Sequence, residues 1–429
     1  MIPTSLSEDT PMKRTYICID LKSYYASVEC VQRGLDPFTT NLVVADPTRG
    51  PGALCLAISP ALKALGVRNR CRLYEIPRNI SYITAMPRMK LYMEQSAAIY
   101  QIYLRYIAPE DLFPYSIDEC FLDVTPYHSL YRKSGHGMAQ FLMNQVFQET
   151  GICATAGIGP NLFLAKIAMD ILAKHLPTHI GSLDETSFQQ TMWHHRPITD
   201  FWQIASGTAR KLEKLGVYDL YGITRLPEHT LYKTFGKQAE YLIDHAWGRE
   251  PCTIEDIRNY RPENRSLSTG QVLFEDYTAT DAKILIYEMA ETLIQELLDK
   301  NLLTQGISLH IGYSGHHLSS QGSHKLEQPT DSPRMILEAF TALYQEKVDP
   351  HLPIRQLNLS VERLQPATPH LYQNNLFIHP ALDKRDKTIE KVMIAIKKKH
   401  GKNAILRGIN YLPKANQRKR NTLIGGHHA

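Results

Sequence analysis

The sequence lacks any long run of apolar residues. No stretch reaches the 18 or more residues that a membrane-spanning helix needs. Met1 to Pro11 is polar and has no apolar centre of the kind that a secretory signal carries. We therefore expect a protein without a membrane segment, located in the cytoplasm.

Cysteine is scarce and is not arranged for disulfide or zinc chemistry. The seven cysteines are odd in number, lie scattered between Cys18 and Cys252, and include no C-x-x-C pair. We interpret them as reduced thiols, most of them buried.

Basic charge is low over most of the chain and concentrated at its end. The net charge of +5 combines −5 over the first 380 residues with +10 from Ala381 onward. A basic end of this kind suits contact with a polyanion, although it can equally be a solvated tail. With 429 residues, 43% of them hydrophobic, the chain is long enough for roughly two to four globular domains.

Two apolar stretches end in carboxylates. Residues 15–22 carry Asp20 near the end of a predicted buried strand, and residues 115–124 place Asp118 and Glu119 near the tip of a predicted hairpin. Each alone is typical of a turn former, a helix cap or a solvated pair. If the strands are neighbours, three hard oxygen ligands converge, which suits Mg²⁺ or Mn²⁺. A pair of such ions stabilises both the attacking and the leaving oxygen of a phosphoryl displacement, so we interpret the two stretches as a nucleotidyl-transfer site.

These two stretches resemble the catalytic motifs of a known family. Asp20–Ala26 (Asp-Leu-Lys-Ser-Tyr-Tyr-Ala) and Ser116–Asp123 (Ser-Ile-Asp-Glu-Cys-Phe-Leu-Asp) are similar to those of Y-family translesion DNA polymerases, most of all the bacterial UmuC-like (ImpB/MucB/SamB) branch. The resemblance extends from about Thr15 to the C-terminus. It implies a template-directed, error-prone DNA polymerase of low processivity that acts in DNA damage tolerance on primer-template DNA and deoxynucleoside triphosphates (dNTPs).

The expected architecture is multidomain, α/β and α+β. The predicted order of strand, helix, hairpin, helix, strand and helix is typical of a ferredoxin-like fold. By resemblance, residues 1–22 and 86–180 form the palm, 23–85 small fingers, 181–257 a helical thumb with a helix-hairpin-helix, and 266–365 a little finger. A linker is expected at 258–265, and residues 366–429 are expected to be a clamp-binding and basic tail.

Several local elements follow from apolar periodicity and turn signals. A strand is expected at 53–58, a helix after the Ser59-Pro60 cap, and one continuous helix at 162–174. Three strands are expected in the little finger, at 267–272, 306–313 and 355–361. In the tail, an apolar stripe of Ile389, Val392, Met393 and Ile396 predicts a helix that docks on the little finger.

The resemblance assigns roles to the carboxylates. Asp20 and Asp118 would bridge two Mg²⁺ ions, with Mn²⁺ as an alternative, and Glu119 would hold the ion at the primer 3′-hydroxyl. The carbonyl of Leu21 would complete the shell of the second ion.

Nucleotide binding is implied for residues next to these ligands. Backbone N–H groups of Ser23 and Tyr24 would hold the triphosphate. Tyr25 would be the steric gate that clashes with a ribose 2′-hydroxyl, although adjacent tyrosines can also be core packing. Lys174 and Lys63 would bind phosphates, Lys63 as a point charge in place of the arginine of many relatives.

Two regions depart from the family pattern. Ala57 and Pro60 stand where relatives carry a hydroxyl residue and a tyrosine, which predicts altered triphosphate contacts. In the hairpin of the thumb, Gly207, Thr208 and Lys211 are the expected DNA-binding residues. Gln203 and Ala205 replace the usual glycines there, so a plain helical turn is an equal alternative to phosphate binding.

The tail contains a candidate partner motif. Gln373-Asn374-Asn375-Leu376-Phe377 resembles the peptide by which bacterial polymerases bind the sliding clamp, with Gln373, Leu376 and Phe377 as contacts. An accessory subunit is a further candidate partner, and the sequence does not decide whether one is needed.

Two other functions compete with polymerase activity. A catalytically weak DNA- and clamp-binding factor descended from a polymerase would explain the altered fingers, but it has no chemical need for three carboxylates, Tyr25 and Lys174. A nucleotidyl cyclase would need no thumb, little finger or clamp peptide. We therefore expect a polymerase, and metal-dependent primer extension separates the three.

Overall fold

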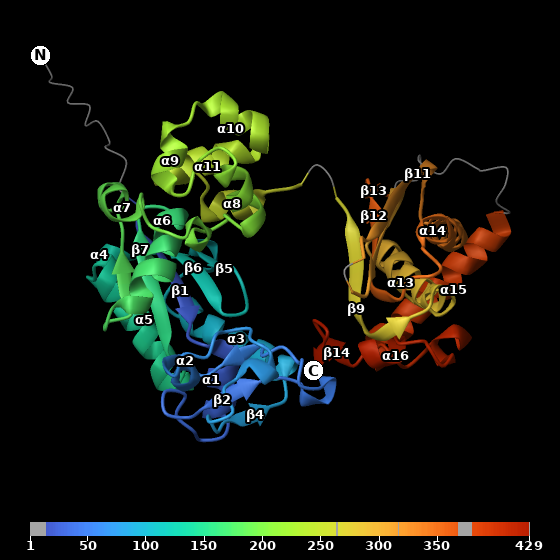
Figure 1. The fold of residues 1–429 in the computed structure, drawn as a ribbon, viewed down its shortest axis with the longest axis horizontal. Coiled ribbons are helices and arrows are strands. Elements are labelled where there is room, and N and C mark those ends of the chain that lie inside the picture. The colour runs from blue at the N-terminus through green and yellow to red at the C-terminus, as the bar shows by residue number, and fades with distance from the viewer. Residues whose placement is uncertain (1–13, 263–264, 316, 368–379, 429) are drawn as a thin grey trace, which may run out of the picture. The chain divides into compact units, whose positions relative to one another are not determined.

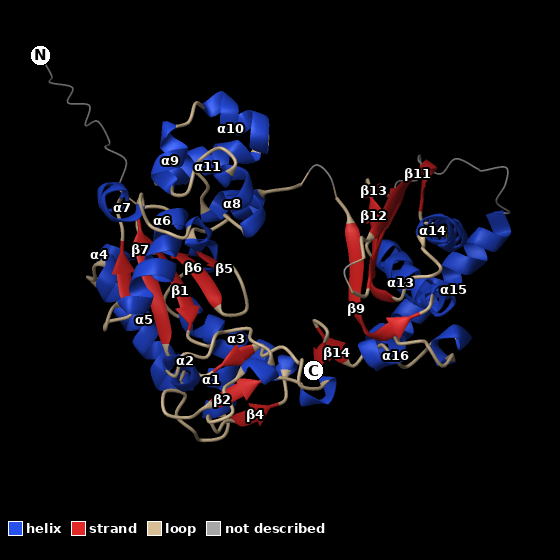
Figure 2. Cartoon of the chain, in the orientation of Figure 1, coloured by secondary structure: helices blue, strands red, loops and turns tan. Residues whose placement is uncertain are grey.

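The structure combines helices and strands in the described residues, which are 14–262, 265–315, 317–367 and 380–428 of this computed structural model (Figures 1 and 2). The chain divides into two units, Met1–Tyr260 and Arg261–Ala429. The last helix of the first unit, α12 (Ile254–Asn259), buries Ile254 against the central sheet of that unit. The expected linker at 258–265 therefore begins too early, inside a helix. No helix among the described residues is long and apolar enough to span a bilayer.

A five-stranded sheet forms the centre of the first unit. Its strand order is β5-β6-β1-β7-β8, with β1 antiparallel to both β6 and β7. The ferredoxin-like arrangement predicted from the sequence is confirmed, with β8 added parallel to β7. The strands are β1 (Tyr16–Leu21), β5 (Leu112–Pro114), β6 (Glu119–Asp123), β7 (Ala154–Gly159) and β8 (Ile180–Ser182).

The two faces of this sheet are covered by different helices. Ile17 and Ile19 of β1 pack into a core with α3 (Met89–Leu104) and α5 (Gly135–Thr150). Tyr16 and Cys18 instead contact α6 (Leu162–Ile167) and α12. Since side chains of a strand alternate between faces, Asp20 continues the α6 side. A short helix, α4 (Tyr127–Tyr131), precedes α5.

A small subdomain is inserted between β1 and α3. It contains α1 (Tyr24–Val31) and a three-stranded sheet in the order β3-β2-β4, with β2 at Leu42–Val44, β3 at Ala57–Ile58, β4 at Ile83–Ala85, and helix α2 at Pro60–Ala64. The predicted cap is confirmed, because Ser59 Oγ accepts a hydrogen bond from the N–H of Leu62.

The strand predicted at 53–58 is wrong in its first half. Leu54 bridges to Arg72, whereas Ala57 pairs with Val44 of β2. The apolar run changes partner at Leu56 and so cannot continue as one strand.

The helix predicted at 162–174 is also interrupted. After α6 the chain forms a π-helical turn at Ala168–Leu172 and a 3₁₀ turn at Ala173–His175. This wider turn lies directly on the sheet: a Cβ on Gly157 would sit 2.2 Å from the backbone nitrogen of Met169. Glycine is required there because the helix backbone occupies the space of its side chain.

Five helices pack on the outer side of α6. They are α7 (Glu185–Met192), α8 (Ser206–Glu213), α9 (Leu220–Arg225), α10 (Glu228–Phe235) and α11 (Gln238–Ala246). Their common core includes Phe188, Phe201 and Leu212, and Phe163 of α6 joins it.

The second unit is an antiparallel sheet in the order β11-β10-β12-β9. Helices α13 and α14 pack on one face, and α15 packs on both helices. The elements are β9 (Leu267–Tyr277), α13 (Ala279–Asp299), β10 (Leu302–Tyr313), β11 (Ser320–Thr330), α14 (Pro333–Lys347), β12 (Ile354–Glu362), β13 (Gln365–Pro366), α15 (Pro380–His400), α16 (Gln417–Arg420), β14 (Leu423–Ile424) and β15 (His427–His428). Strand β11 is not predicted from the sequence, because this edge strand has few apolar residues to alternate.

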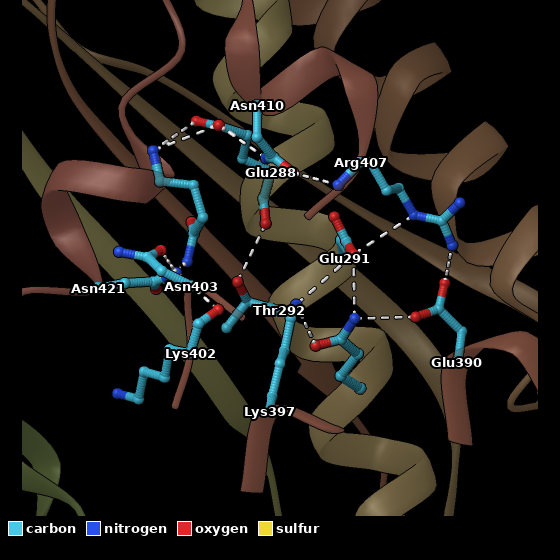
Figure 3. A network of polar contacts seen from close by, with 12 residues as sticks. Glu288, Glu291, Thr292, Glu390, Lys397, Lys402, Asn403, Arg407, Asn410 and Asn421 are labelled. Atoms are coloured by element: carbon cyan, nitrogen blue, oxygen red, sulfur yellow. Dashed lines mark hydrogen bonds and ion pairs between the residues drawn. The ribbon is translucent and has the colours of Figure 1, made fainter. Parts of the chain in front are cut away.

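The tail helix α15 docks as predicted, but through a different face. Met393 is buried, whereas Ile389 and Val392 are 39% and 52% exposed. The docked face is largely polar and includes Glu390, which is 2% exposed, and Lys397, whose Nζ donates to Gln295 on α13 (Figure 3). Apolar periodicity alone therefore identified the wrong face of this helix.

Candidate active site

The pairing of β1 with β6 brings the candidate carboxylates together. Asp20 lies directly opposite Glu119, and the N–H of Leu21 donates to the carbonyl of Asp118 at 2.9 Å. Residues opposite each other on antiparallel strands share a face, so Asp20 and Glu119 both lie on the α6 side. The expectation that the two strands are neighbours is confirmed.

The electrostatics of Asp20 reflect this convergence. Burial raises the pKa of Asp20 to about 7, and the negative charges of Asp118 and Glu119 act in the same direction. Lys174 and Lys166 oppose the shift. A cation placed among the three carboxylates would relieve both the burial cost and the repulsion.

Each of the other two carboxylates already has a partner. Glu119 accepts a hydrogen bond from Lys166 Nζ at 2.6 Å, and Lys166 also pairs with Asp170 at 2.9 Å. Asp118 accepts from Ser116 Oγ at 2.7 Å. In the part of the chain that the structure describes, no three His, Cys, Asp or Glu side chains form a ready metal-binding group. The donor chemistry thus fits hard divalent cations, while the orientation of Glu119 and Asp118 is set by Lys166 and Ser116.

A cavity of about 770 Å³ opens beside these carboxylates. It gathers in one place every residue of the first unit that was expected to bind metal or nucleotide. These are Asp20, Leu21, Ser23, Tyr24, Tyr25, Lys63, Asp118, Glu119 and Lys174. Ala57 and Pro60, the departures from the family pattern, line it as well.

The two adjacent tyrosines have different environments. Tyr24 is 3% exposed and its hydroxyl donates to the carbonyl of Tyr92 at 2.6 Å, so its side chain is part of the core. Tyr25 stacks on Tyr92 with ring centres 4.5 Å apart, is only half-buried, and lines the cavity. Ser23 adopts a left-handed φ of 50°, which turns the chain from β1 into α1 at the cavity wall.

Two cations that the sequence did not single out also line the cavity, Lys22 and Arg70. Lys22 Nζ lies 3.0 Å from the ring nitrogen Nδ1 of His179. Burial lowers the pKa of Lys22 and of Lys63. Lys22 falls inside the first motif, which is a signal that could have been used, whereas nothing in the sequence distinguishes Arg70 from Arg68 or Arg72.

The predicted DNA-binding residues of the thumb lie on α8, away from this cavity. Gly207 and Lys211 are exposed, and Thr208 lines a separate cavity of about 260 Å³. Gln203 has a φ of 68°, so the turn keeps the left-handed backbone that a glycine would adopt. Gln373, Leu376 and Phe377 lie outside the described residues, and their clamp contact stays a prediction.

Comparison with known proteins agrees with this geometry. Models of the impB/mucB/samB family and of its C-terminal domain match residues 19–170 and 264–376, together more than half of the chain. The chain belongs to the impB/mucB/samB family. It therefore shares the UmuC-like ancestry that its motifs predicted.

Relatives of this impB/mucB/samB protein match over nearly their full length. A putative UV-damage repair protein UvrX of Bacillus subtilis is 29% identical over 97% of this chain and 98% of its own. DNA polymerase IV 2 of the same organism is 28% identical over 97% of this chain and 99% of its own length. A solved Y-family DNA polymerase chimera aligns with a TM-score of 0.63 at 21% identity, covering 82% of this chain and 99% of its own. The multidomain Y-family fold is thereby confirmed.

The sequence gives no indication that Lys166 belongs to this site. It is 4% exposed and sits within the apolar stripe of α6, between Ala165 and Ile167. Its partners Glu119 and Asp170 are the reason that a charge is tolerated there.

We expect Lys166 and Glu119 to be energetically coupled. Urea unfolding is measured without divalent ions for the wild type, Lys166→Met, Glu119→Gln and the double variant. The coupling energy should be about 1–3 kcal/mol, because Lys166→Met leaves the largely buried Glu119 carboxylate without its cation, whereas Lys166 in Glu119→Gln keeps its pair with Asp170. The exposed pair Arg105–Glu149, also at 2.6 Å, is the matched control and should give less than about 1 kcal/mol. Additive effects of Lys166→Met and Glu119→Gln would contradict the pairing.

Proposed function

We infer that this chain is a template-directed DNA polymerase of the translesion type, which adds deoxynucleotides to a primer 3′-hydroxyl in DNA damage tolerance. The observation that carries this inference is the 770 Å³ cavity, which combines three carboxylates with four cations. In a chain with the Y-family fold, that combination is suited to a nucleoside triphosphate and its metal ions.

Asp20, Asp118, Glu119 and the carbonyl of Leu21 would hold two divalent cations, Mg²⁺ or Mn²⁺. Such ions, when bound, lower the pKa of the primer hydroxyl and neutralise charge on the α-phosphate. Lys166 donates a hydrogen bond to the Glu119 carboxylate, which limits the orientations that the carboxylate can take toward a metal ion.

Residues of the fingers and palm orient the incoming nucleotide. Lys63, Arg70 and Lys174 neutralise the triphosphate as point charges or planar donors, and the first residues of α1 form the wall beside it. Tyr25 would act as the steric gate under the sugar, and its stack on Tyr92 supports this role because it restrains the ring at the cavity wall.

The rest of the chain holds the DNA in this proposal. Residues 1–22 and 86–180 are the palm, 23–85 the fingers, 181–257 the thumb and 266–365 the little finger. In this proposal α8 contacts the phosphate backbone of the duplex through Gly207, Thr208 and Lys211. Contact with a sliding clamp is assigned to Gln373, Leu376 and Phe377.

The alternative function, a catalytically weak DNA- and clamp-binding factor, is not favoured. Burying Asp20 beside two other carboxylates destabilises the charged group, as its raised pKa indicates. Such an arrangement serves a polymerase, whereas a factor that only binds DNA gains nothing from it.

Primer extension with Mg²⁺ and dNTPs tests the proposed function. Asp118→Ala should abolish extension, a loss of at least about a thousandfold, because a metal ligand is removed at the reacting phosphate. Binding of primed DNA, measured by fluorescence anisotropy, should stay within about twofold of wild type. Glu94→Ala, which removes an exposed carboxylate of the same unit, is the control and should extend normally. Extension by Asp118→Ala at the wild-type rate would refute the metal assignment.

The gate assignment is tested by the choice of sugar. In Tyr25→Ala the ratio of ribonucleotide to deoxynucleotide insertion should rise by about tenfold or more, because the ring that meets the 2′-hydroxyl is gone. Tyr25→Phe keeps the ring and should discriminate as wild type does. Equal sugar discrimination in Tyr25→Ala and wild type would remove Tyr25 from this role.

A further inference from the structure

One face of the sheet in the second unit is open, and its charged residues, such as Lys325 and Glu362 opposite Gly306, lie outside the hollow at its centre. Helices α13 and α14 cover the other face. The open face has a shallow hollow of about 620 Å³ whose described lining contains no Lys, Arg, Asp or Glu. Its polar side chains are hydroxyls, amides and an imidazole, among them Ser268, Ser308, His310, Ser323, Asn358 and Ser360. Such groups can hydrogen-bond to phosphate, but they provide no net attraction to a polyanion.

The missing cations lie in residues 401–428, which we call the C-terminal arm. It carries six Lys or Arg residues and no Asp or Glu. The arm follows α15 and returns along α13 to the edge strand β9. The alternative of a solvated tail is therefore wrong for these residues.

A buried carboxylate fixes the arm in place. Glu288 on α13 is 1% exposed and accepts a hydrogen bond from Nδ2 of Asn410 at 2.9 Å (Figure 3). It also accepts from the N–H of Asn416 at 3.0 Å and the N–H of Gln417 at 3.2 Å. Arg407 adds ion pairs to Glu291 and Glu390. Because Glu288 is satisfied only when the arm is docked, undocking would leave a buried charge unpaired.

The anchored arm places three consecutive cations beside β9. The guanidinium of Arg418 lies 4.8 Å from the ring centre of Tyr411, and Lys419 Nζ lies 3.9 Å from that of Phe274. Arg420 Nη2 donates to the carbonyl of Gly270 on β9 at 3.4 Å.

These cations are at the rim of the open face. Leu273 is in the core, so its neighbour Phe274 faces the opposite, open side and brings Lys419 there. Among the described residues no ion pair is formed by Arg418, Lys419 or Arg420, in contrast to Lys414, which pairs with Glu275 at 2.8 Å. The charges of Arg418 and Lys419, which are exposed, are thus free to meet an external anion, whereas Arg420 is half-buried against Gly270.

We propose that the C-terminal arm is a phosphate-binding strip that supplies the positive charge absent from the hollow of the open sheet face, so that arm and sheet together bind the backbone of duplex DNA. The proposal rests on the proposed function, since a polymerase must hold its primer-template. A duplex backbone fits this surface because cations without carboxylate partners adjoin a hollow lined by hydroxyls and amides, and both kinds of group can bind phosphate oxygens. Cations above aromatic rings are oriented while their charge stays accessible.

Salt-dependent DNA binding by the full-length protein tests this strip. The variant Arg418→Gln/Lys419→Gln removes two exposed charges and keeps polar side chains of similar length. For a primed duplex followed by anisotropy between about 50 and 200 mM salt, the slope of log affinity against log salt should fall in magnitude by about 1.8, with about tenfold weaker binding. Lys384→Gln/Arg385→Gln, which removes two exposed charges from α15 of the same unit, should leave the slope unchanged.

The outcomes separate this proposal from the proposed function. Wild-type slope and affinity in Arg418→Gln/Lys419→Gln, in a protein that still extends primers, would overturn the strip and leave the polymerase intact. An equal change of the salt slope in the control Lys384→Gln/Arg385→Gln would overturn it too, because the slope would then depend on net charge and not on the position of the cations. Weaker binding to anionic vesicles with unchanged DNA binding would assign the arm to a membrane surface instead. Absence of DNA binding and extension in the wild type would instead refute the polymerase.

Discussion

The antiparallel pairing of β1 with β6 is the contact on which the site depends. It sets Asp20 opposite Glu119 and ties Leu21 to the carbonyl of Asp118, so that three carboxylates meet in a largely buried place. Burial and like charge act against this arrangement, as the raised pKa of Asp20 records. The surrounding fold offsets that cost in two ways. Gly157 lets α6 lie on the sheet, which brings Lys166 to Glu119, and the cavity wall adds cations opposite the carboxylates. In the proposed function, the repulsion among the three carboxylates favours the binding of divalent cations.

In the second unit, hydrogen-bonding groups and positive charges lie on different elements. The hollow of its open sheet face is uncharged and polar, while the C-terminal arm concentrates cations at the β9 edge. Glu288 makes this possible, because a buried carboxylate that accepts backbone N–H groups holds the arm without consuming Arg418 or Lys419. The excess positive charge after Ala381 therefore has a structural explanation: part of it, such as Arg407, closes the polar network, and part remains available.

Much of the site was predictable, because it lies in short contiguous motifs. Asp20 at a strand end, the Asp118–Glu119 pair and the Ser59–Pro60 cap are local signals, and the ferredoxin-like order followed from the sequence of elements. The roles given to the site residues and the domain boundaries inside each unit stay predictions. What the sequence did not reveal depends on contacts distant in the chain. Lys166 occupies a position that apolar periodicity assigns to the core, and its charge is explained only by its contact with Glu119. Helix α15 docks through Glu390, which contacts Arg407 and Gln295, and through Lys397, which also contacts Gln295. Strand β11 has little apolar pattern because it is an edge, and the helix at 162–174 widens because it must fit the glycines beneath it.

The most direct test of the account is a count of bound Mn²⁺ by electron paramagnetic resonance, in the presence of primed DNA and a non-hydrolysable dNTP analogue. The wild type should hold about two ions per chain, and Asp20→Asn should hold fewer with weaker affinity, since it removes a shared ligand while keeping its shape. The unfolding midpoint of Asp20→Asn should not fall, because the substitution removes a destabilised buried charge. Equal Mn²⁺ binding by the two proteins would show that Asp20 is not a metal ligand and would contradict the account at its centre.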